Sequence, residues 1–212
     1  MREGALSPYR DALADAGRLS LVTDDGVEVP LAIERYLAEA DPVDALVVHA
    51  CAAPVLDVGC GPGRIVHALA AAGKAALGVD IADVAVALTQ QRGVPALRRD
   101  VFDRVPGEGR WPTVLVLDGN IGIGGDVAGL LDRLLALMAP GGSLIIEASV
   151  PDPDTDRVLD VRFCRDGRPM GPVFGWAVVG PAALGRHAGR AGLVAADYWS
   201  AGGRTFTRFS RA

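Results

Sequence analysis

The stretch that most constrains the fold is PVLDVGCGPGRIVHALAAAG, which runs from Pro54 to Gly73. It begins with a short apolar run, interrupted by Asp57, that predicts a buried strand. Three glycines then crowd a sharp turn, and apolar residues at helical spacing follow them until Gly73 gives a stop signal. A strand that passes through glycines into a helix presents free amides and the positive end of the helix dipole to a ligand. The sequence therefore predicts a cradle for a small molecule.

Strand and helix signals alternate regularly after this stretch. Further strands are predicted at residues 75–79, 96–99, 113–117 and 143–148. Helices are predicted at residues 83–91 and from an N-cap at Asp126 to Met138. Residues 140–142 (Pro-Gly-Gly) give a stop signal for the second helix, and residues 106–111 are predicted to be a loop. Such alternation is typical of a parallel, doubly wound sheet with right-handed crossovers, so the predicted fold class is α/β.

The segments on either side of this core lack its regularity. Residues 1–53 are predicted to form an N-terminal cap, with helices at 9–16, 33–38 and 42–50 and a hairpin of residues 19–23 and 27–31. Residues 151–180 are predicted to be a β-hairpin insertion, with strands at 157–164 and 173–178, and residues 181–212 a closing helix and strand pair. We expect one domain over residues 1–212 with its core at 54–150. Either the cap only packs against the core, or it supplies Tyr9, Glu34, Tyr36 or His49 to a substrate pocket.

Composition argues against several classes of protein. Half of the 212 residues are hydrophobic and the net charge is −5, which suits a packed α/β domain and disfavours a nucleic-acid partner. Five arginines between residues 186 and 211 leave a nucleic-acid partner as an alternative, but we interpret them as a solvated face. The three cysteines form no CxxC pair, which favours a reducing, cytoplasmic setting without structural zinc. No leader and no apolar run of membrane length is present, so we expect neither secretion nor membrane insertion.

Acidic side chains follow the predicted strands. Ligands bind outside the carboxyl ends of the strands in an open parallel sheet, and Asp57, Asp80, Asp100 and Asp118 stand at four such ends. Asp80 follows the glycine turn by about twenty residues, the spacing at which an acid meets ribose hydroxyls in nucleotide-binding folds. Asp100 is placed to accept a hydrogen bond from an exocyclic amine. Beside it, Val101 and Phe102 offer apolar surface for a purine.

The turn itself, GCGPG, narrows the choice of ligand. A pyrophosphate needs several amide donors, whereas Pro62 removes one and Asp57 adds a negative charge nearby. A ligand with an ammonium and a sulfonium suits these residues better. An NAD-dependent oxidoreductase stays an alternative, although its glycine spacing normally differs and no catalytic Tyr/Lys pair is visible, since Lys74 is the one lysine of the chain.

The segment VLDVGCGPG, residues 55–63, resembles the first motif of class I S-adenosylmethionine-dependent methyltransferases. DGNIGIGGD, residues 118–126, is similar to a stretch in small actinobacterial-type methyltransferases. The resemblance implies S-adenosylmethionine as cofactor and a seven-stranded, mostly parallel Rossmann-like sheet with an antiparallel last strand. It implies contacts to the methionine part from Asp57, Gly59, Cys60, Gly61 and Gly63, to the ribose from Asp80 and Ile81, and to the adenine from Asp100, Val101 and Phe102. Asp118, Gly119 and Asn120 would face both cofactor and acceptor.

The acceptor is less constrained. The Asn/Asp-Pro-Pro-Tyr signature of DNA-amine methylation is absent, which favours a small-molecule acceptor. Asp118 is the first candidate to contact or deprotonate the acceptor, with Asn120 orienting it and His49 and Glu147 in reserve. Asp118, Asn120 and Asp126 are residue types that could serve as a set of magnesium ligands, but we expect no metal. Tyr9, Tyr36 and Trp176 are either walls of the acceptor pocket or core. A non-catalytic partner subunit that binds the cofactor for stability is a second alternative.

Overall fold

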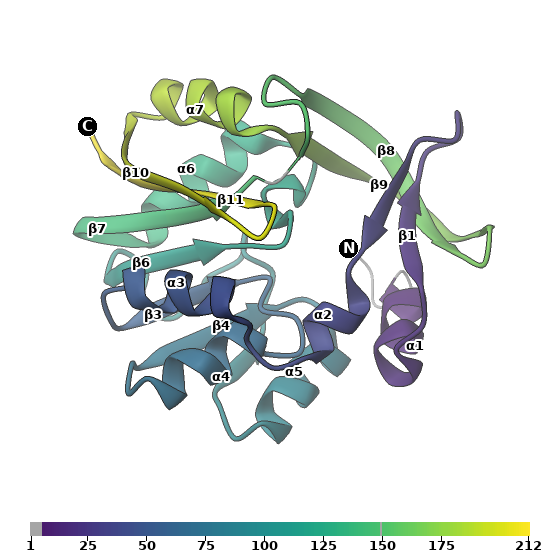
Figure 1. The fold of residues 1–212 in the computed structure, drawn as a ribbon, viewed down its shortest axis with the longest axis horizontal. Coiled ribbons are helices and arrows are strands. Elements are labelled where there is room, and N and C mark those ends of the chain that lie inside the picture. The colour runs from purple at the N-terminus through teal and green to yellow at the C-terminus, as the bar shows by residue number, and fades with distance from the viewer. Residues whose placement is uncertain (1–5, 149) are drawn as a thin grey trace.

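A seven-stranded sheet forms the centre of the computed structural model, which describes residues 6–148 and 150–212. Its strand order is β10-β11-β7-β6-β3-β4-β5 (Figure 1). The strands are β3 (Val55–Val58), β4 (Ala76–Asp80), β5 (Ala96–Arg98), β6 (Trp111–Val116), β7 (Met138–Glu147), β10 (Leu193–Ala201) and β11 (Arg204–Arg211). Strands β3 to β7 are parallel, and β11 is antiparallel to both of its neighbours. The predicted α/β class, with a Rossmann-like sheet and an antiparallel last strand, is confirmed.

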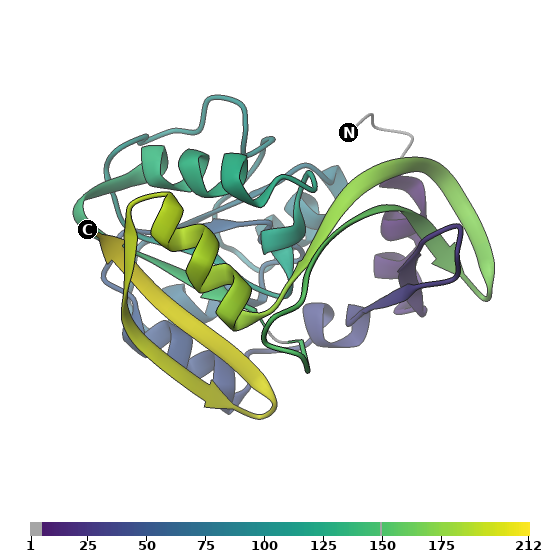
Figure 2. The same ribbon diagram turned by 90° about the horizontal axis from the view of Figure 1, so that it is seen from above.

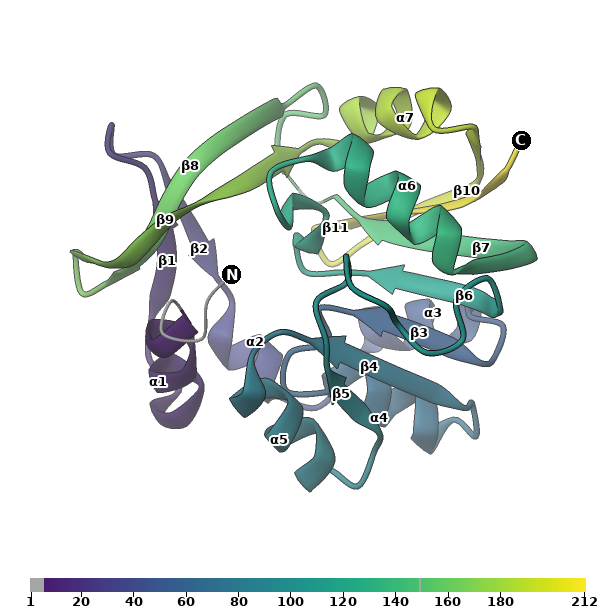
Figure 3. The same ribbon diagram turned by 180° about the vertical axis from the view of Figure 1, so that it is seen from behind.

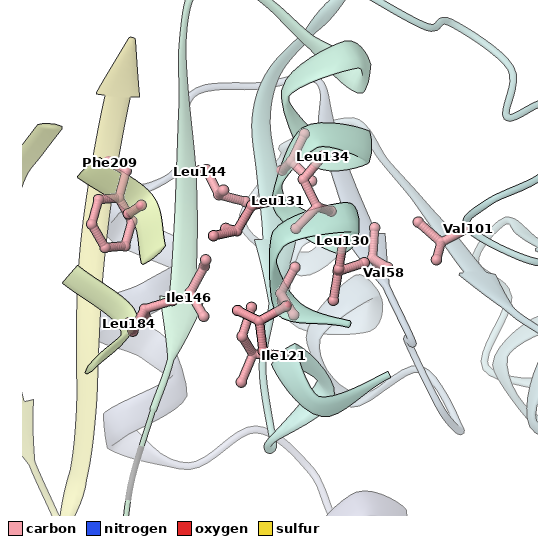
Figure 4. Close-up of a cluster of buried hydrophobic side chains, with 14 of the residues drawn as sticks. Val58, Val101, Ile121, Leu130, Leu131, Leu134, Leu144, Ile146, Leu184 and Phe209 are labelled. Atoms are coloured by element: carbon pink, nitrogen blue, oxygen red, sulfur yellow. The ribbon is translucent and has the colours of Figure 1, made fainter. Parts of the chain in front are cut away.

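Helices cover both faces of this sheet (Figure 2). One layer holds α3 (Pro42–Ala50), α4 (Arg64–Ala71) and α5 (Asp83–Gln91), and the other holds α6 (Val127–Leu137) and α7 (Pro181–Arg190). Along β6, Val114 and Val116 pack into the cluster on the side of α6 and α7, whereas Leu115 packs with α3 and α4. Figure 4 shows the first cluster. Because both faces are buried, the central strands are mostly apolar in sequence instead of alternating between apolar and polar residues.

A second sheet stands beyond the carboxyl ends of the parallel strands (Figures 1 and 3). It has the order β2-β1-β8-β9, formed by β1 (Leu19–Val22), β2 (Glu28–Leu31), β8 (Asp156–Arg165) and β9 (Arg168–Val179). Strand β1 is antiparallel to β8, with Ser20 opposite Cys164. Helices α1 (Ser7–Asp15) and α2 (Ile33–Leu37) accompany it. The predicted N-terminal cap and the predicted hairpin insertion are therefore parts of one sheet, which we call the cap sheet.

Several predicted boundaries were wrong. Helix α6 ends at Leu137, and the Pro-Gly-Gly segment that was interpreted as its stop lies inside β7. Trp111, expected in a loop, begins β6 and is paired with Met138 of β7. The hairpin strands β8 and β9 are also longer than predicted. In each case pairing with a neighbouring strand extends the element beyond its own sequence signal.

Four of the five C-terminal arginines contact acidic side chains or a backbone carbonyl. Arg204 is buried, while Arg186 and Arg208 lie beside Asp154 and Asp197 at 2.5 and 2.9 Å. Arg211 donates to the backbone carbonyl of Leu135. Within residues 6–148 and 150–212, no helix has the length and apolar character needed to cross a membrane.

Candidate functional site

A cavity of about 550 Å³ lies between the carboxyl ends of the parallel strands and the cap sheet. The strand order of the large sheet reverses between β3 and β6, so the turns after these strands diverge there. Residues from the turns after β3, β4, β5 and β6 form one wall, and residues of α1, α2 and the cap sheet form the other. A volume of this size is typical of small-molecule sites.

The glycine turn lies against the cavity in a conformation that needs glycine. Gly59, Gly61 and Gly63 all have positive φ, at 71, 52 and 84°. A Cβ at Gly59 would lie 2.4 Å from Nδ2 of Asn120, and a Cβ at Gly63 would lie 2.6 Å from the side chain of Thr89. The hydroxyl of Tyr9 lies above Gly61, 3.4 Å from the place of a Cβ. The backbone of the turn is thus approached closely from both sides.

Two carboxyl groups, Asp57 buried and Asp80 half-buried, flank this turn. Asp57, at the end of β3, is 3% exposed, and burial together with the nearby Asp118 charge raises its pKa to about 7. Asp80, at the end of β4, accepts from the backbone amides of Gly61 and Ala82 at 2.9 and 2.8 Å. Burial raises the pKa of Asp80 as well, and these amide hydrogen bonds oppose that shift. The Asp80 carboxylate therefore joins the glycine turn to the next strand while lining the cavity.

The residues after β5 continue the same wall. One Asp100 oxygen accepts from the amide of Phe102 at 3.0 Å, which shapes the turn. Val101 is buried, whereas the Phe102 ring is 47% exposed and its edge lies 3.4 Å from the Cβ position of Gly124. Asp100, Val101 and Phe102 all line the cavity, as does Ile81.

Asp118 is not a free carboxylate. Its oxygens lie 2.7 Å from guanidinium nitrogens of both Arg35 and Arg64, and 3.5 Å from Arg204. Burial raises the pKa of Asp118, and the arginines oppose that shift. Its backbone amide donates to Glu147, and its φ of 56° is in the left-handed region. Asn120 is also occupied, because its side-chain nitrogen donates to the Gly59 carbonyl at 2.9 Å.

These contacts belong to a larger group of charges, which we call the buried ion network. Arg64 pairs with Asp44 as well as with Asp118, and Arg204 pairs with Asp44 at 2.7 Å and with Glu147 at 2.8 Å. Its members are Arg35, Asp44, Arg64, Asp118, Glu147 and Arg204. The three acids and three arginines balance in charge. The network links α2, α3, α4, the turn after β6, β7 and β11 behind the cavity wall.

The glycine-rich loop at residues 118–126 is where the core meets the cap sheet. It contains a short 3₁₀ helix, η2 (Asn120–Gly122), and Ile123 bridges to Trp176 of β9. A Cβ at Gly122 would lie 2.2 Å from the Ala177 carbonyl, and a Cβ at Gly125 would lie 3.2 Å from Gly175. These glycines allow the backbone of the loop to pack directly on β9. Asp126 accepts from the Gly129 amide and caps α6, as predicted.

The structure brings most of the predicted site residues together. The cavity is lined by Asp57, Gly59, Cys60, Gly61, Asp80, Ile81, Asp100, Val101, Phe102, Asp118 and Asn120, and by Tyr9, Tyr36 and Trp176 of the other wall. Gly63, the N-cap of α4, and Gly119 are not among the lining residues. His49 lies in a separate groove between α3 and α4, and Glu147 lies in the buried ion network behind the wall. The Cys60 sulfur lies directly over Gly78. A Cβ at position 78 would collide with this sulfur, so the contact requires glycine at that position.

Sequence reasoning missed Arg35, Asp44, Arg64 and Arg204. Each is an ordinary charged residue in the sequence, and the partners are 20 to 160 positions apart. A partial signal was present at Arg64, because it follows the glycine turn directly and so begins the helix beside the site.

Comparison with solved structures shows which proteins share this fold. Over 100% of this chain and 97% of the other, the fold matches a SAM-dependent methyltransferase from Bacteroides fragilis in complex with S-adenosyl-L-homocysteine, with a TM-score of 0.82 and 21% identity. It also matches the 1,6-didemethyltoxoflavin-N1-methyltransferase of Burkholderia thailandensis, with a TM-score of 0.66 and 17% identity over 97% of this chain and 86% of that one. The fold is therefore that of the class I methyltransferases.

Sequence comparison adds a matching domain and a curated relative. Residues 55–142 match the family described as "Methyltransferase domain". The trans-aconitate 2-methyltransferase of Paracidovorax citrulli is 32% identical over 113 residues, which is 51% of this chain and 42% of that protein. The chain thus covers less than half of the length of this relative. The matched domain lies within the core of the fold, and the chain shares that fold with S-adenosylmethionine-dependent methyltransferases.

Proposed function

We propose that this chain is an enzyme that transfers a methyl group from S-adenosylmethionine to a small-molecule acceptor. One observation carries the proposal: the glycine turn after β3, Asp57, Asp80 and the Asp100–Phe102 segment line one cavity of about 550 Å³. These residues come from three successive strand ends, which is where an open α/β sheet binds its ligand.

The residues present fit this cofactor. Asp57 is buried and lines the cavity, and burial together with the Asp118 charge raises its pKa to about 7, so a cationic ligand group beside it would stabilise its ionised form. Each Asp80 oxygen accepts one amide hydrogen bond and retains a lone pair for a hydroxyl group. The half-exposed Phe102 ring offers apolar surface at the cavity edge. We propose that these three residues meet the ammonium, the ribose and the adenine.

The bound cofactor supplies a methyl group already activated by positively charged sulfur. The chain therefore has to hold two molecules in line and keep water away. The glycine turn fixes one position, since Asn120 above Gly59 and Asp80 at Gly61 leave its backbone little freedom. The cap sheet covers the other side of the cavity.

Asp118 receives a different role from the one first predicted. The Asp118 carboxylate oxygens are held by the guanidinium groups of Arg35 and Arg64 at 2.7 Å, so they are engaged in ion pairs and are not placed to take a proton from an acceptor. We propose that Asp118 fixes the cavity floor through the buried ion network, and that Asn120 is a positioning residue for the glycine turn. This role leaves no protein side chain as general base. We therefore propose an acceptor whose methylation needs no general base from the protein.

Calorimetry with S-adenosylmethionine, S-adenosylhomocysteine and NAD tests the proposal. We expect both sulfur ligands to bind and NAD not to bind. Asp80→Asn should weaken S-adenosylhomocysteine binding by about tenfold or more, since the new amide group has to face a backbone N–H and donates where the ribose needs an acceptor. Asp83→Asn, on the exposed first turn of α5, is the matched control and should leave affinity unchanged.

The outcomes separate the alternatives. NAD binding without either sulfur ligand would point to the oxidoreductase alternative. Binding of S-adenosylmethionine with no labelled methyl group transferred to any metabolite of a cell extract would favour the non-catalytic partner. Equal affinity of Asp80→Asn and the native protein would remove the ribose assignment.

A further inference from the structure

The two walls of the cavity differ in chemistry. The wall formed by the strand ends carries Asp57, Asp80, Asp100 and the glycine turn. The opposite wall, which we call the apolar wall, consists of Leu21 and Leu31 of the first hairpin, Tyr36 of α2, Phe163 of β8, and Phe174 and Trp176 of β9. Phe163 and Phe174 pack with their ring centroids 5.3 Å apart. The side of the cavity left for an acceptor is therefore aromatic and aliphatic.

Two arginines line the cavity, and both lie in the wall formed by the strand ends. The Arg64 guanidinium contacts Asp44 and Asp118. Arg99 is exposed and lies next to Asp100, away from the apolar wall. Lys74 donates to backbone carbonyls at the end of α3, including that of Cys51 at 2.6 Å. Among the residues that the structure describes, no lysine or histidine lines the cavity.

We propose that the acceptor is an uncharged, flat, apolar molecule that lies against the apolar wall. The inference rests on the proposed function and adds the chemical class of the acceptor. Burying a carboxylate or phosphate here without a counter-charge would cost several kcal/mol, whereas a flat ring gains contact area against aromatic side chains. The same cavity of about 550 Å³ also has to hold the cofactor, so the acceptor is small.

The architecture fixes the position of the apolar wall. Trp176 and Gly175 pack on the backbone of Gly122 to Gly125, where glycine allows an approach that side chains would prevent. The apolar wall is therefore packed on the core, and this packing sets the width of the slot between the two walls of the cavity. Tyr36 lines the slot, and burial raises its pKa to about 12, so its hydroxyl stays protonated and donates to a neutral acceptor atom.

The experiment has two stages. The first measures S-adenosylhomocysteine binding alone by calorimetry. The second saturates the protein with S-adenosylhomocysteine and titrates 2-naphthol, 6-hydroxy-2-naphthoate, which is the same ring system with a carboxylate, and citrate. We expect 2-naphthol to bind about tenfold or more tightly than the naphthoate, and citrate not to bind.

Three variants locate the binding surface. Phe174→Ala should weaken 2-naphthol binding by about fivefold or more, since it removes aromatic contact area. Leu31→Arg adds a charge to a half-buried position at the end of β2 and should shift the preference toward the naphthoate. Val158→Ala is the control, because Val158 is 68% exposed on β8 and does not line the cavity.

Each result bears on one proposal only. If S-adenosylhomocysteine does not bind, the proposed function fails. If it binds, equal or tighter binding of the naphthoate, binding of citrate, or no binding of 2-naphthol overturns the inference while the methyltransferase proposal stands. An unchanged 2-naphthol affinity in both folded variants, Phe174→Ala and Leu31→Arg, would also overturn it.

Discussion

At the scale of single residues, Asp57 illustrates a site prepared for a cation. A carboxyl group that is 3% exposed and faces Asp118 and Asp80 is costly to ionise, and Arg64 offsets only part of that cost. Its pKa of about 7 places the change of charge within the neutral range. A cationic ligand group beside Asp57 would favour the ionised form and so couple binding to proton release.

The Asp57 carboxyl should make ligand binding depend on pH. Below about pH 7 the unliganded protein holds a proton there, so affinity for S-adenosylhomocysteine should fall as pH is lowered, by up to about tenfold per pH unit. Calorimetry between about pH 5 and 7.5, in buffers of different ionisation enthalpy, should detect release of up to one proton. Asp57→Asn should abolish this dependence. A native affinity that does not change over this range would contradict the assignment of Asp57 to the ammonium.

Asn120 shows how a residue changes its apparent role once its contacts are known. Its position after β6 suggested that it orients an acceptor. Its side-chain nitrogen donates to the Gly59 carbonyl and lies where a Cβ at Gly59 would be. The loop after β6 and the glycine turn after β3 are therefore interlocked, which explains glycine at position 59.

At the scale of elements, the contact between η2 and β9 holds the cap sheet on the core. The resemblance implied that Asp118, Gly119 and Asn120 of the loop at residues 118–126 face the cofactor and the acceptor. In the structure two other glycines of this loop, Gly122 and Gly125, lie under Ala177 and Gly175 of β9. Their main physical role is close packing of backbone on backbone, which positions the apolar wall.

Gly122→Ala should therefore destabilise the junction between core and cap sheet. The new Cβ would lie 2.2 Å from the Ala177 carbonyl, which is backbone and cannot turn aside. We expect a loss of about 2 kcal/mol in the free energy of unfolding, measured by urea denaturation, and faster amide exchange in β9. Gly185→Ala in α7, where a Cβ meets open space, is the control and should be neutral or stabilising by up to about 1 kcal/mol. Equal stability of the two variants would contradict this account of the loop.

Element prediction succeeded where the signal is local. The alternation from β3 to β7 and the closing strands β10 and β11 follow from apolar periodicity and turn residues. Pairing between β1 and β8 was not predicted, because Ser20 and Cys164 are 144 positions apart. The face of a half-buried strand shows that it needs a partner but not which strand it pairs with.

At the scale of the whole molecule, the buried ion network joins parts of the chain that are otherwise packed separately. Arg204 of β11 reaches Asp44 of α3 and Glu147 of β7, while Arg35 of α2 reaches Asp118. The Arg204 guanidinium also lies 5.0 Å from the centroid of the Phe206 ring. Breaking such a network on one side leaves unpaired charges in the interior.

Arg204→Met should lower the free energy of unfolding by about 3–5 kcal/mol at pH 7, because Glu147 and Asp44 would lose a buried counter-charge. Arg208→Met on the same strand, which breaks a half-exposed pair with Asp197, should cost about 1 kcal/mol or less. Chemical denaturation of both variants measures the difference. Adding Glu147→Gln to Arg204→Met should recover part of the loss, and similar losses in the two arginine variants would contradict the role of the network.

Acid should narrow the difference between the native protein and Arg204→Met. The arginines hold the pKa values of Asp44 and Glu147 below their usual 3.8 and 4.5. A lowered pKa in the folded state contributes stability that is present above the unfolded pKa and is lost as pH falls through the folded value. Stability measured from about pH 7 to 3 should therefore decline below about pH 4 in the native protein more steeply than in the variant. Parallel curves would show that these carboxylates are not held by Arg204.

The parallel core, the glycine turn and the acids at its strand ends could be predicted from the amino-acid sequence, because strand and helix periods, turn residues and their spacing are local properties of the chain. Tertiary structure alone decided that the N-terminal hairpin and the insertion form one sheet, that Asp118 is held by arginines, and that the loop at residues 118–126 carries β9. A charged or glycine residue looks the same in the sequence whether it meets solvent, a ligand or a distant segment. Only the fold brings Asp44 and Arg204, 160 positions apart, into contact.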